Sequence, residues 1–469
     1  MSDLNSNGQG TLQLIIPLLI VLSSLITFAI MIPVLSTTKT IVLAAGLVVF
    51  VASFASTEIA LYILIFSMLL SPEFMIGATS GASLGRGVTL RLDDFMLIII
   101  GFSWLAKMSI NKELGLFLKT PLNKPIAFYI VICLVSTLFG SMFGRVYLKT
   151  GFFFVLKYFE YMIIYFMVVN HLESRRQVRY FLWAMLLTCA IVSVIGIIQI
   201  PTGGRITAPF EGVSGEPNTL GGYLVLMVSV VAGLFLTSPV FRNRLIYGLL
   251  ILLFTIPLIY TQSRSSYLAI IPAAITLLWL SEKKNLVLVV LILLGISLPF
   301  LAPKVAKERV SYTFSQGRGR IDVVEIAGIK LDTSTSARVA SWRNASRDWI
   351  KHPLLGYGVT GYRFVDAQYV RVITETGLLG LITFLFLIFT IFRRTLNTFR
   401  ESDDSFYRGI SLGFLAGFIG LLFHSFGANT FIIVRIMEPF WFIAAMVSMI
   451  PEMNKDESLD IRSEKTQEP

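Results

Sequence analysis

Three arginines of this chain lie in surroundings that suggest chemistry. Arg338 lies in the polar segment SARVASWRNASRDWIKHP, where a helical period places it among tryptophans. Arg264 lies between two apolar segments in TQSRSSYLAI, and Arg205 lies in the Gly- and Pro-rich segment GRITAPFEG. Ionisable groups at membrane depth are candidates for functional sites, and the planar guanidinium group suits phosphate. We therefore expect these arginines to bind an anion, and a diphosphate is the ligand that suits such a cluster.

Asp366 is the candidate general base. It lies in YRFVDAQYVRVITETG, where the chain returns to an apolar segment. If the helix already includes Asp366, its carboxylate shares a stripe with Val370, Ile373 and Gly377 and points inward, where it can accept a proton from a hydroxyl group. The same residue also fits as the N-cap of the following helix. Both interpretations agree with the sequence.

Each arginine also has a purely structural interpretation. Arg338 fits a cation–π contact or a structural ion pair as well as it fits a phosphate ligand. Arg264 and Arg205 can reach the membrane surface along their alkyl stems. A convergence of all three on one face of the membrane would favour the binding site.

Lys157, His424 and Arg435 are weaker candidates for binding the substrate. Lys157 lies three residues before Glu160 in an apolar segment, so the two side chains can pair on one face of a helix, although Lys157 can also face the ligand. His424 and Arg435 flank the last outward loop, where they can line a cavity. We predict no metal site and no cofactor, because the three histidines are scattered and the outward loops hold no Asp-x-Asp-like pair.

The composition places these residues in a membrane protein. The chain has 469 residues, of which 55% are hydrophobic and 14% charged, and its mean hydropathy is +0.77. Soluble domains carry about 25% charged residues, so we expect an all-α polytopic membrane protein with about 12–14 transmembrane helices. The net charge of +11 is dispersed among loops, which argues against a nucleic-acid partner. The apolar windows predict spans near 12–35, 41–56, 58–71, 92–106, 125–144, 151–170, 179–201, 219–238, 245–261, 266–281, 285–303, 371–392, 409–427 and 435–450.

The distribution of cations predicts the topology. If the spans alternate, fifteen Lys and Arg residues fall in the short loops of one side and eight in those of the other. The richer side is expected to be cytoplasmic, with both termini inside and the long, partly helical loop 304–370 outside. We expect N-terminal transmembrane helices over 1–200, a second transmembrane unit over 201–450 that includes this loop, and a disordered cytoplasmic tail over 451–469.

Several motifs occur in the order of a known family. They are GRITAPFEG…EPNTLGGYL, then TQSRSSYLA, then SARVASWRNASRDWIKHPLLGYGVTGY, and last YVRVITETGLLG. In this order they resemble the O-antigen ligase/polysaccharide polymerase family of bacterial inner-membrane proteins. The resemblance covers residues 200–392 well and the N-terminal third only in general hydropathy.

The resemblance implies an enzyme that acts on undecaprenyl-diphosphate-linked glycans at the periplasmic face, without metal, by an inverting glycosyl transfer. Arg264 and Arg338 match the arginines that the family uses for the diphosphate and for catalysis, and Arg205 matches a polar position of the preceding outward segment. A flippase and a chain-length regulator are the partners that such a role implies, together with the lipid bilayer.

One departure from the family pattern bears on the reaction. Ligases commonly carry a His-Asn pair before the tyrosine of the last motif, whereas this chain has Asp366 and Ala367. We therefore favour a polymerase of exopolysaccharide or O-antigen repeat units over a ligase that transfers finished glycan to lipid A core or protein. A transporter or flippase is the alternative of another class, but a large outward loop with an arginine on its apolar face does not suit it, because transport sites lie near the midplane.

Overall fold

The computed structural model describes residues 37–76, 88–110, 119–211, 215–289, 325–326, 329–330 and 333–467, with positions 292 and 307. In these residues the protein is helical apart from two short antiparallel hairpins. They pair β1 (Glu73–Ile76) with β2 (Val88–Arg91), and β3 (Glu325–Ile326) with β4 (Ile329–Lys330). The prediction of an all-α polytopic membrane protein is confirmed.

Eight helices of the described residues are long and apolar enough to cross a membrane, and three shorter apolar helices accompany them. Two predicted spans, 12–35 and most of 285–303, lie outside the described residues. The first half of the chain contains α2 (Thr37–Ala55), α3 (Thr57–Leu70), α4 (Leu92–Ile110), α5 (Asn123–Met142), α6 (Leu148–His171), α7 (Arg175–Gln199) and η2 (Ile200–Thr202). The second half contains α8 (Pro217–Thr237), α9 (Phe241–Tyr260), α10 (Arg264–Leu280), α13 (Thr333–Trp349), α14 (Gln368–Glu401), α15 (Ser405–His424), η4 (Thr430–Ile432) and α16 (Val434–Gln467).

Local sequence signals set several helix starts. Ser174 and Gln177 form a capping box at the start of α7, so this helix begins before the apolar window that predicts it. The carboxylate of Asp404 accepts hydrogen bonds from two amides of the first turn of α15. Ser263 caps α10, which places Arg264 in the first turn of that helix.

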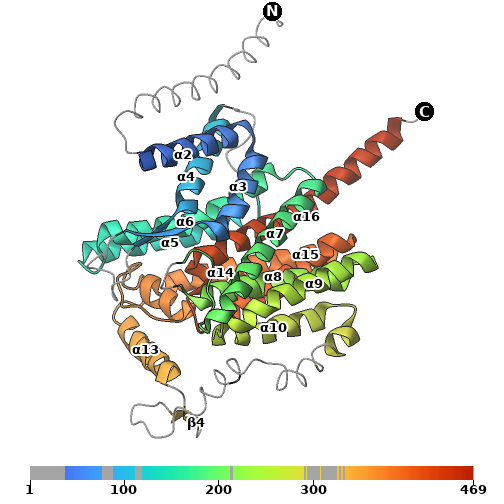
Figure 1. Ribbon diagram of the computed structural model, residues 1–469. Helices are drawn as coiled ribbons and strands as arrows, with labels where there is room; N and C mark the ends of the chain where they lie inside the picture. The colour runs from blue at the N-terminus through green and yellow to red at the C-terminus, as the bar shows by residue number, and fades with distance from the viewer. Residues whose placement is uncertain are drawn as a thin grey trace, which may run out of the picture.

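The centre of the second half is the close contact between α8 and α15. In Figure 1, α8, α9, α10 and α15 lie side by side. Gly409, Gly413 and Gly417 repeat every fourth residue along α15, and a Cβ atom on Gly413 would lie 2.5 Å from the carbonyl oxygen of Ser229 on α8. Helices in lipid associate through such small residues because their backbones can then approach closely.

The C-terminal segment differs from the prediction of a disordered tail. The helix α16 continues without interruption from the last predicted span to Gln467. The segment after Met453 contains several Glu, Lys and Arg residues, which are good helix formers. A helix that is already nucleated in the bundle can extend through such a sequence.

Candidate functional site

Arg338 and Asp366 lie together. The Nε atom of Arg338 is 3.7 Å from Oδ2 of Asp366, and the two side chains are 26% and 39% exposed. Trp342, one turn after Arg338 on α13, donates its indole hydrogen to the backbone oxygen of Asp366 at 2.8 Å. On the same face of α13, Ala345 is fully buried. The predicted stripe of α13 is therefore the face that packs on the Asp366 segment.

The alternative in which the helix already includes Asp366 is not observed. The helix α14 begins at Gln368, and its N-cap is Ala367, which has a φ of 158° and makes no side-chain capping bond. Asp366 lies in the turn just before the helix, so the N-cap interpretation is not observed either. Its carboxylate is directed to Arg338 by the turn and by the hydrogen bond of Trp342.

The turn over residues 353–361 inserts into a break in α14. Gly377 has a φ of 69° and a ψ of −166°, which interrupts the helix. The amides of Leu378 and Leu379 donate to the carbonyl oxygens of Pro353 and Leu354 at 2.8 and 3.2 Å. A Cβ atom on Gly377 would overlap the Leu354 carbonyl group, so glycine is required there.

The same turn is also bonded to the segment before the break. The amides of Tyr357 and Gly358 donate to the carbonyl oxygens of Thr374 and Glu375 at 2.9 and 2.8 Å. These carbonyl groups are the ones that the break leaves without helical partners. The turn therefore replaces the missing helical bonds and becomes a fixed part of α14.

Helix α5 holds the turn from the other side. The hydroxyl group of Ser136 donates to the carbonyl oxygens of Leu355 and Glu375 at 2.5 and 2.8 Å. The hydroxyl group of Thr137 accepts from the amide of Val359 at 3.3 Å. The site is thus anchored by main-chain and hydroxyl contacts to two helices that are long enough to span a membrane.

Arg371 and Glu375 form a buried ion pair that the sequence analysis misses. Nε of Arg371 lies 3.1 Å from Oε1 of Glu375, and both side chains are almost fully buried. The same carboxylate oxygen accepts from the amide of Thr360 in the turn at 3.3 Å. The four-residue spacing in RVITE is the signal that could have found this pair. Glu375 thereby links the first segment of α14 to the turn.

The pKa values of two groups on the turn are shifted by their neighbours. Hydrogen bonds from Lys351 and from the hydroxyl group of Tyr362 lower the pKa of Asp348. Burial and the cations of Arg145 and Lys351 lower the pKa of His352, so its ring is neutral at pH 7. This ring packs edge-on against Tyr357 at 4.7 Å between centroids. His352 therefore packs against the turn.

Arg205 braces the segment that leads into Arg264. Its Nε and Nη2 atoms donate to the carbonyl oxygens of Thr261 and Gln262 at 3.2 and 3.3 Å. Gln262 has a φ of 51°, a left-handed conformation that turns the chain from α9 into α10. Arg264 follows at the first position of α10, where the helix dipole adds partial positive charge. Two of the predicted arginines thus belong to one local unit.

The loop over residues 425–430 connects this unit to the Asp366 segment. On one side, a Cβ atom on Gly427 would overlap the hydroxyl group of Ser265, the neighbour of Arg264. On the other side, the amide group of Asn429 donates to the carbonyl oxygen of Val365, the neighbour of Asp366, at 2.9 Å. The start of α10 and the Asp366 turn therefore flank the same loop at one end of the bundle.

His424 and Arg435 are occupied inside the protein. The ring nitrogens of His424 lie 2.8 Å from the hydroxyl group of Thr430 and 3.2 Å from that of Ser266, and the side chain is fully buried. The guanidinium group of Arg435 donates to the carbonyl oxygens of Leu69, Pro209 and Ser71 at 2.7–3.1 Å. These contacts account for both side chains without a substrate.

Lys157 belongs to a buried ion cluster. Its ammonium group contacts the carboxylate of Asp94 and lies 3.1 Å from Oε2 of Glu160. Arg91 pairs with Asp93 at 3.0 Å in the same cluster. The pairing of Lys157 with Glu160 on one helix face is confirmed, and this contact accounts for Lys157 without a substrate.

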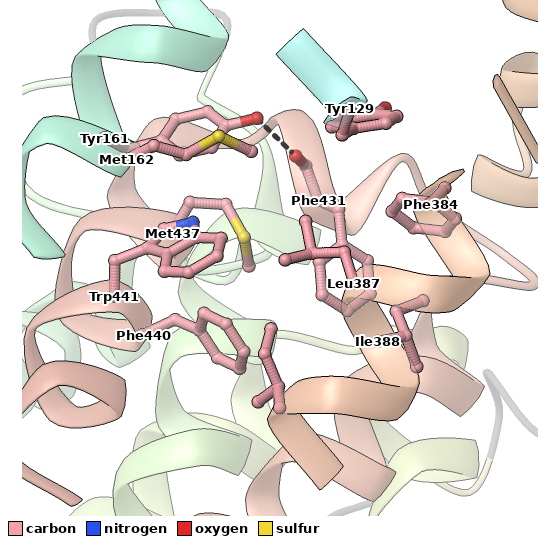
Figure 2. A pocket seen from close by; sticks show the side chains of 11 residues that line it. Tyr129, Tyr161, Met162, Phe384, Leu387, Ile388, Phe431, Met437, Phe440 and Trp441 are labelled. Carbon is pink, nitrogen blue, oxygen red and sulfur yellow. Dashed lines mark hydrogen bonds between the residues drawn. The ribbon is translucent and has the colours of Figure 1, made fainter. Parts of the chain in front are cut away.

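A narrow apolar cavity lies among α5, α6, α14 and α16 (Figure 2). Its volume is about 20 Å³, so its walls lie close together. Gln368, two residues after Asp366, accepts a hydrogen bond from the amide of Phe431, whose ring lines the cavity. Tyr161, which also lines it, donates to the carbonyl oxygen of Phe431 at 2.9 Å. The other lining residues are Tyr129, Met162, Phe384, Leu387, Ile388, Ile391, Met437, Phe440 and Trp441.

Comparison with known protein families matches one segment of the chain. Residues 248–385 match the sequence profile of the family described as O-antigen ligase. This segment contains Arg264, Arg338 and Asp366, together with the turn and the break in α14. No curated protein matches the chain. Residues 248–385 are thus similar to the O-antigen ligase family, and they lie within a polytopic helical fold.

Proposed function

We propose that this protein is a glycosyltransferase of the bacterial inner membrane. In this proposal it is a polymerase that joins undecaprenyl-diphosphate-linked oligosaccharide repeat units into exopolysaccharide or O-antigen. The observation that carries the proposal is the contact of Arg338 with Asp366 at 3.7 Å. It supports pairing the proposed phosphate-binding cation with the proposed proton acceptor, and both side chains are partly exposed.

The proposed reaction is a single displacement. The oxygen of an acceptor hydroxyl group attacks the anomeric carbon of the carrier-linked glycan from the face opposite the diphosphate. As this bond forms, the bond to the diphosphate oxygen breaks, so the configuration inverts. The hydroxyl proton passes to the carboxylate of Asp366, and the diphosphate leaves with the bonding electron pair.

Arginine is proposed to stabilise the leaving group in place of a metal ion. Arg338 and Arg264 would bind the departing diphosphate, which gains negative charge in the transition state. Arg205 orders the backbone before Arg264 through its two carbonyl contacts. Because the two units flank one loop, a single diphosphate between them is the arrangement that the contacts favour.

The apolar cavity supports a lipid-linked donor. It is lined by aromatic and aliphatic side chains of α5, α6, α14 and α16, and Gln368 joins it to the Asp366 segment. We propose that part of the polyprenyl chain packs on this apolar lining, whose walls must move apart to admit it, because the space now measures about 20 Å³. The count of cations in the short loops supports a periplasmic site and cytoplasmic termini.

The test is polymer synthesis by the purified protein in nanodiscs supplied only with carrier-linked repeat units. We expect a ladder of products of inverted configuration, formed equally well with a chelator present. Arg338→Ala and Arg264→Ala should abolish long products. Arg242→Ala is the matched control, because this exposed arginine begins α9 at the end opposite Thr261. Full-length polymer from both site variants would contradict the assignment.

A ligase is the second candidate, and the description of the matched family favours it. Such an enzyme would transfer finished glycan to lipid A core or to protein. Asp366 and Ala367, where ligases commonly have His-Asn, weigh against it. Supplying lipid A core as a second acceptor separates the two, because a ligase makes product only when that acceptor is present.

A further inference from the structure

The face of α13 that points away from Asp366 is cationic and exposed. Ala337, Ala340, Arg343, Arg347 and Ile350 follow one another at spacings of three and four residues, and all are exposed. This spacing forms one continuous stripe along a helix. The stripe carries two arginines and no carboxylate.

Asp348, the acidic residue of α13, is bonded to other groups. Asp348 pairs with Lys351 at 2.9 Å and with Arg363 at 3.8 Å, and it accepts from the hydroxyl group of Tyr362. The hydroxyl group of Tyr357 donates to its backbone oxygen at 3.0 Å. These contacts fasten the end of α13 to the turn, so the stripe has a fixed orientation relative to the bundle.

Large apolar side chains are exposed where α13 ends. Ile350 is 69% exposed and Leu354 is 59% exposed. The carbonyl group of Leu354 accepts from the amide of Leu379, so Leu354 lies beside the first turn of the apolar part of α14. Leu378 and Leu379 are themselves exposed there. This apolar surface is therefore continuous with a helix face that points to lipid.

The end of α5 extends the same surface. The carbonyl group of Tyr357 contacts α5 so closely that a Cβ atom on Gly140 would overlap it. Met142 and Phe143 follow at the end of α5 and are largely exposed. Arg145 lies 5.9 Å from the ring centre of Tyr357. Apolar side chains next to Arg or Lys are the pattern of a membrane–water interface.

We propose that α13 lies on the bilayer as an interfacial helix. The segment from Ile350 to Leu354 enters the boundary between headgroups and acyl chains, and Arg343, Arg347 and Lys351 bind the phosphates of phospholipid headgroups. A solvated basic face is the plain alternative, and it explains the arginines. It does not explain two exposed apolar side chains that continue the lipid-facing ends of α5 and α14.

The inference does not rest on the proposed reaction. If it holds, Arg338 is held at headgroup height by a helix that is bound to the membrane along its other face. The diphosphate of any lipid-linked donor lies at that height. A lipid surface therefore becomes part of what positions the site.

Spin-label depth tests the proposal. The two cysteines of the chain, Cys133 and Cys189, are buried, so a nitroxide attaches selectively to Ile350→Cys. In nanodiscs we expect its collision ratio for oxygen against a water-soluble nickel chelate to exceed that of a label at Asp403→Cys in the exposed α14–α15 loop. It should fall below that of a label at Phe389→Cys in the apolar part of α14. A ratio equal to that of the Asp403 label would overturn the proposal.

Lipid selectivity provides the second readout. We expect the wild-type protein to associate with spin-labelled phosphatidylglycerol more strongly than with phosphatidylcholine. Arg343→Gln and Arg347→Gln should each lower that preference about five-fold, because one surface cation contributes about that factor. Arg343→Lys and Arg347→Lys should retain the preference for phosphatidylglycerol. Two results would contradict headgroup binding. One is an unchanged lipid selectivity in the double Gln variant, and the other is loss of the wild-type selectivity when inorganic phosphate replaces chloride at equal ionic strength.

Discussion

The side chains of Arg338 and Asp366 meet at 3.7 Å although 28 positions separate them in the sequence. The contact joins the helix of the long loop to the residue pair that precedes α14. The indole group of Trp342 bonds to the backbone of the same aspartate. The carboxylate therefore has a defined direction even though it is partly exposed.

Asp366→Asn should lower the rate of polymer formation about 100-fold or more, because the amide is isosteric but accepts a proton poorly. The thermal unfolding temperature should change little, since a half-exposed ion pair contributes about 0.2–1 kcal/mol. Initial rates in nanodiscs and unfolding in detergent measure the two effects. A large loss of stability with an unchanged rate would make Asp366 a structural residue.

Gly377→Ala should destabilise the protein by about 3 kcal/mol or more. The new methyl group would collide with the Leu354 carbonyl group and would also require a positive φ. Gly203→Ala is the matched control, because Gly203 also has a positive φ, of 75°, but nothing lies within 4 Å of its Cβ position. This control should lose only about 1–2 kcal/mol. Equal losses in denaturant titrations would argue against a tight turn–break contact.

Glu375→Leu should cost about 3–5 kcal/mol, because it leaves the buried Arg371 cation without its counter-charge. Arg371→Leu should cost a similar amount for the opposite reason. The double variant should lose less than the sum of the two, and a double-mutant cycle of unfolding free energies measures the difference. Strict additivity would mean that the two side chains do not interact.

Acid should loosen the end of α13 from the turn. The lowered pKa of Asp348 means that its contacts with Lys351 and Tyr362 stabilise the folded state above the ordinary aspartate value of 3.8. That stabilisation is lost as the pH falls through the lower, folded pKa. The protection factors of amides at the end of α13 against hydrogen exchange should therefore fall below about pH 4. In Asp348→Asn these protection factors should be low at every pH, whereas a similar acid response in the variant would exclude this carboxyl group.

Leu387→Trp should impair the use of long-chain donors. Leu387 lines the apolar cavity and is buried, so a larger ring there fills the space assigned to the polyprenyl chain. We expect a raised KM for the undecaprenyl donor and an unchanged KM for an analogue with two isoprene units. Leu385→Trp, at an exposed position of the same helix, is the control. A loss that is equal for both donors would contradict the assignment of the cavity.

The spanning helices could be predicted well because their signal is local. The predicted span 125–144 corresponds to α5 (Asn123–Met142), and the predicted span 219–238 corresponds to α8 (Pro217–Thr237). A run of apolar residues has the same meaning wherever it packs, since lipid leaves a helix as the favoured solution. The amphipathic helix of the long loop follows equally from its periodicity.

The arrangement of the site could be predicted only in part. The sequence analysis selects Arg338 and Asp366 but leaves open whether Asp366 lies inside the helix or caps it. It does not find the break at Gly377, which depends on a partner segment more than twenty residues away. It also names His424 and Arg435 as residues that can line a cavity, but it does not find the buried partners of either side chain. Hydropathy predicts where along a spanning helix a polar residue lies, but it does not predict which backbone groups its side chain bonds to.

The amides just after Gly377 are bonded to Pro353 and Leu354, so the turn and the lipid-embedded half of α14 tilt as one body. A thicker or thinner bilayer changes the tilt of such a helix. The height of the carboxylate above the hydrocarbon is therefore coupled to membrane thickness. Through this connection, we expect the composition of the surrounding lipid to alter the position of the Asp366 carboxylate.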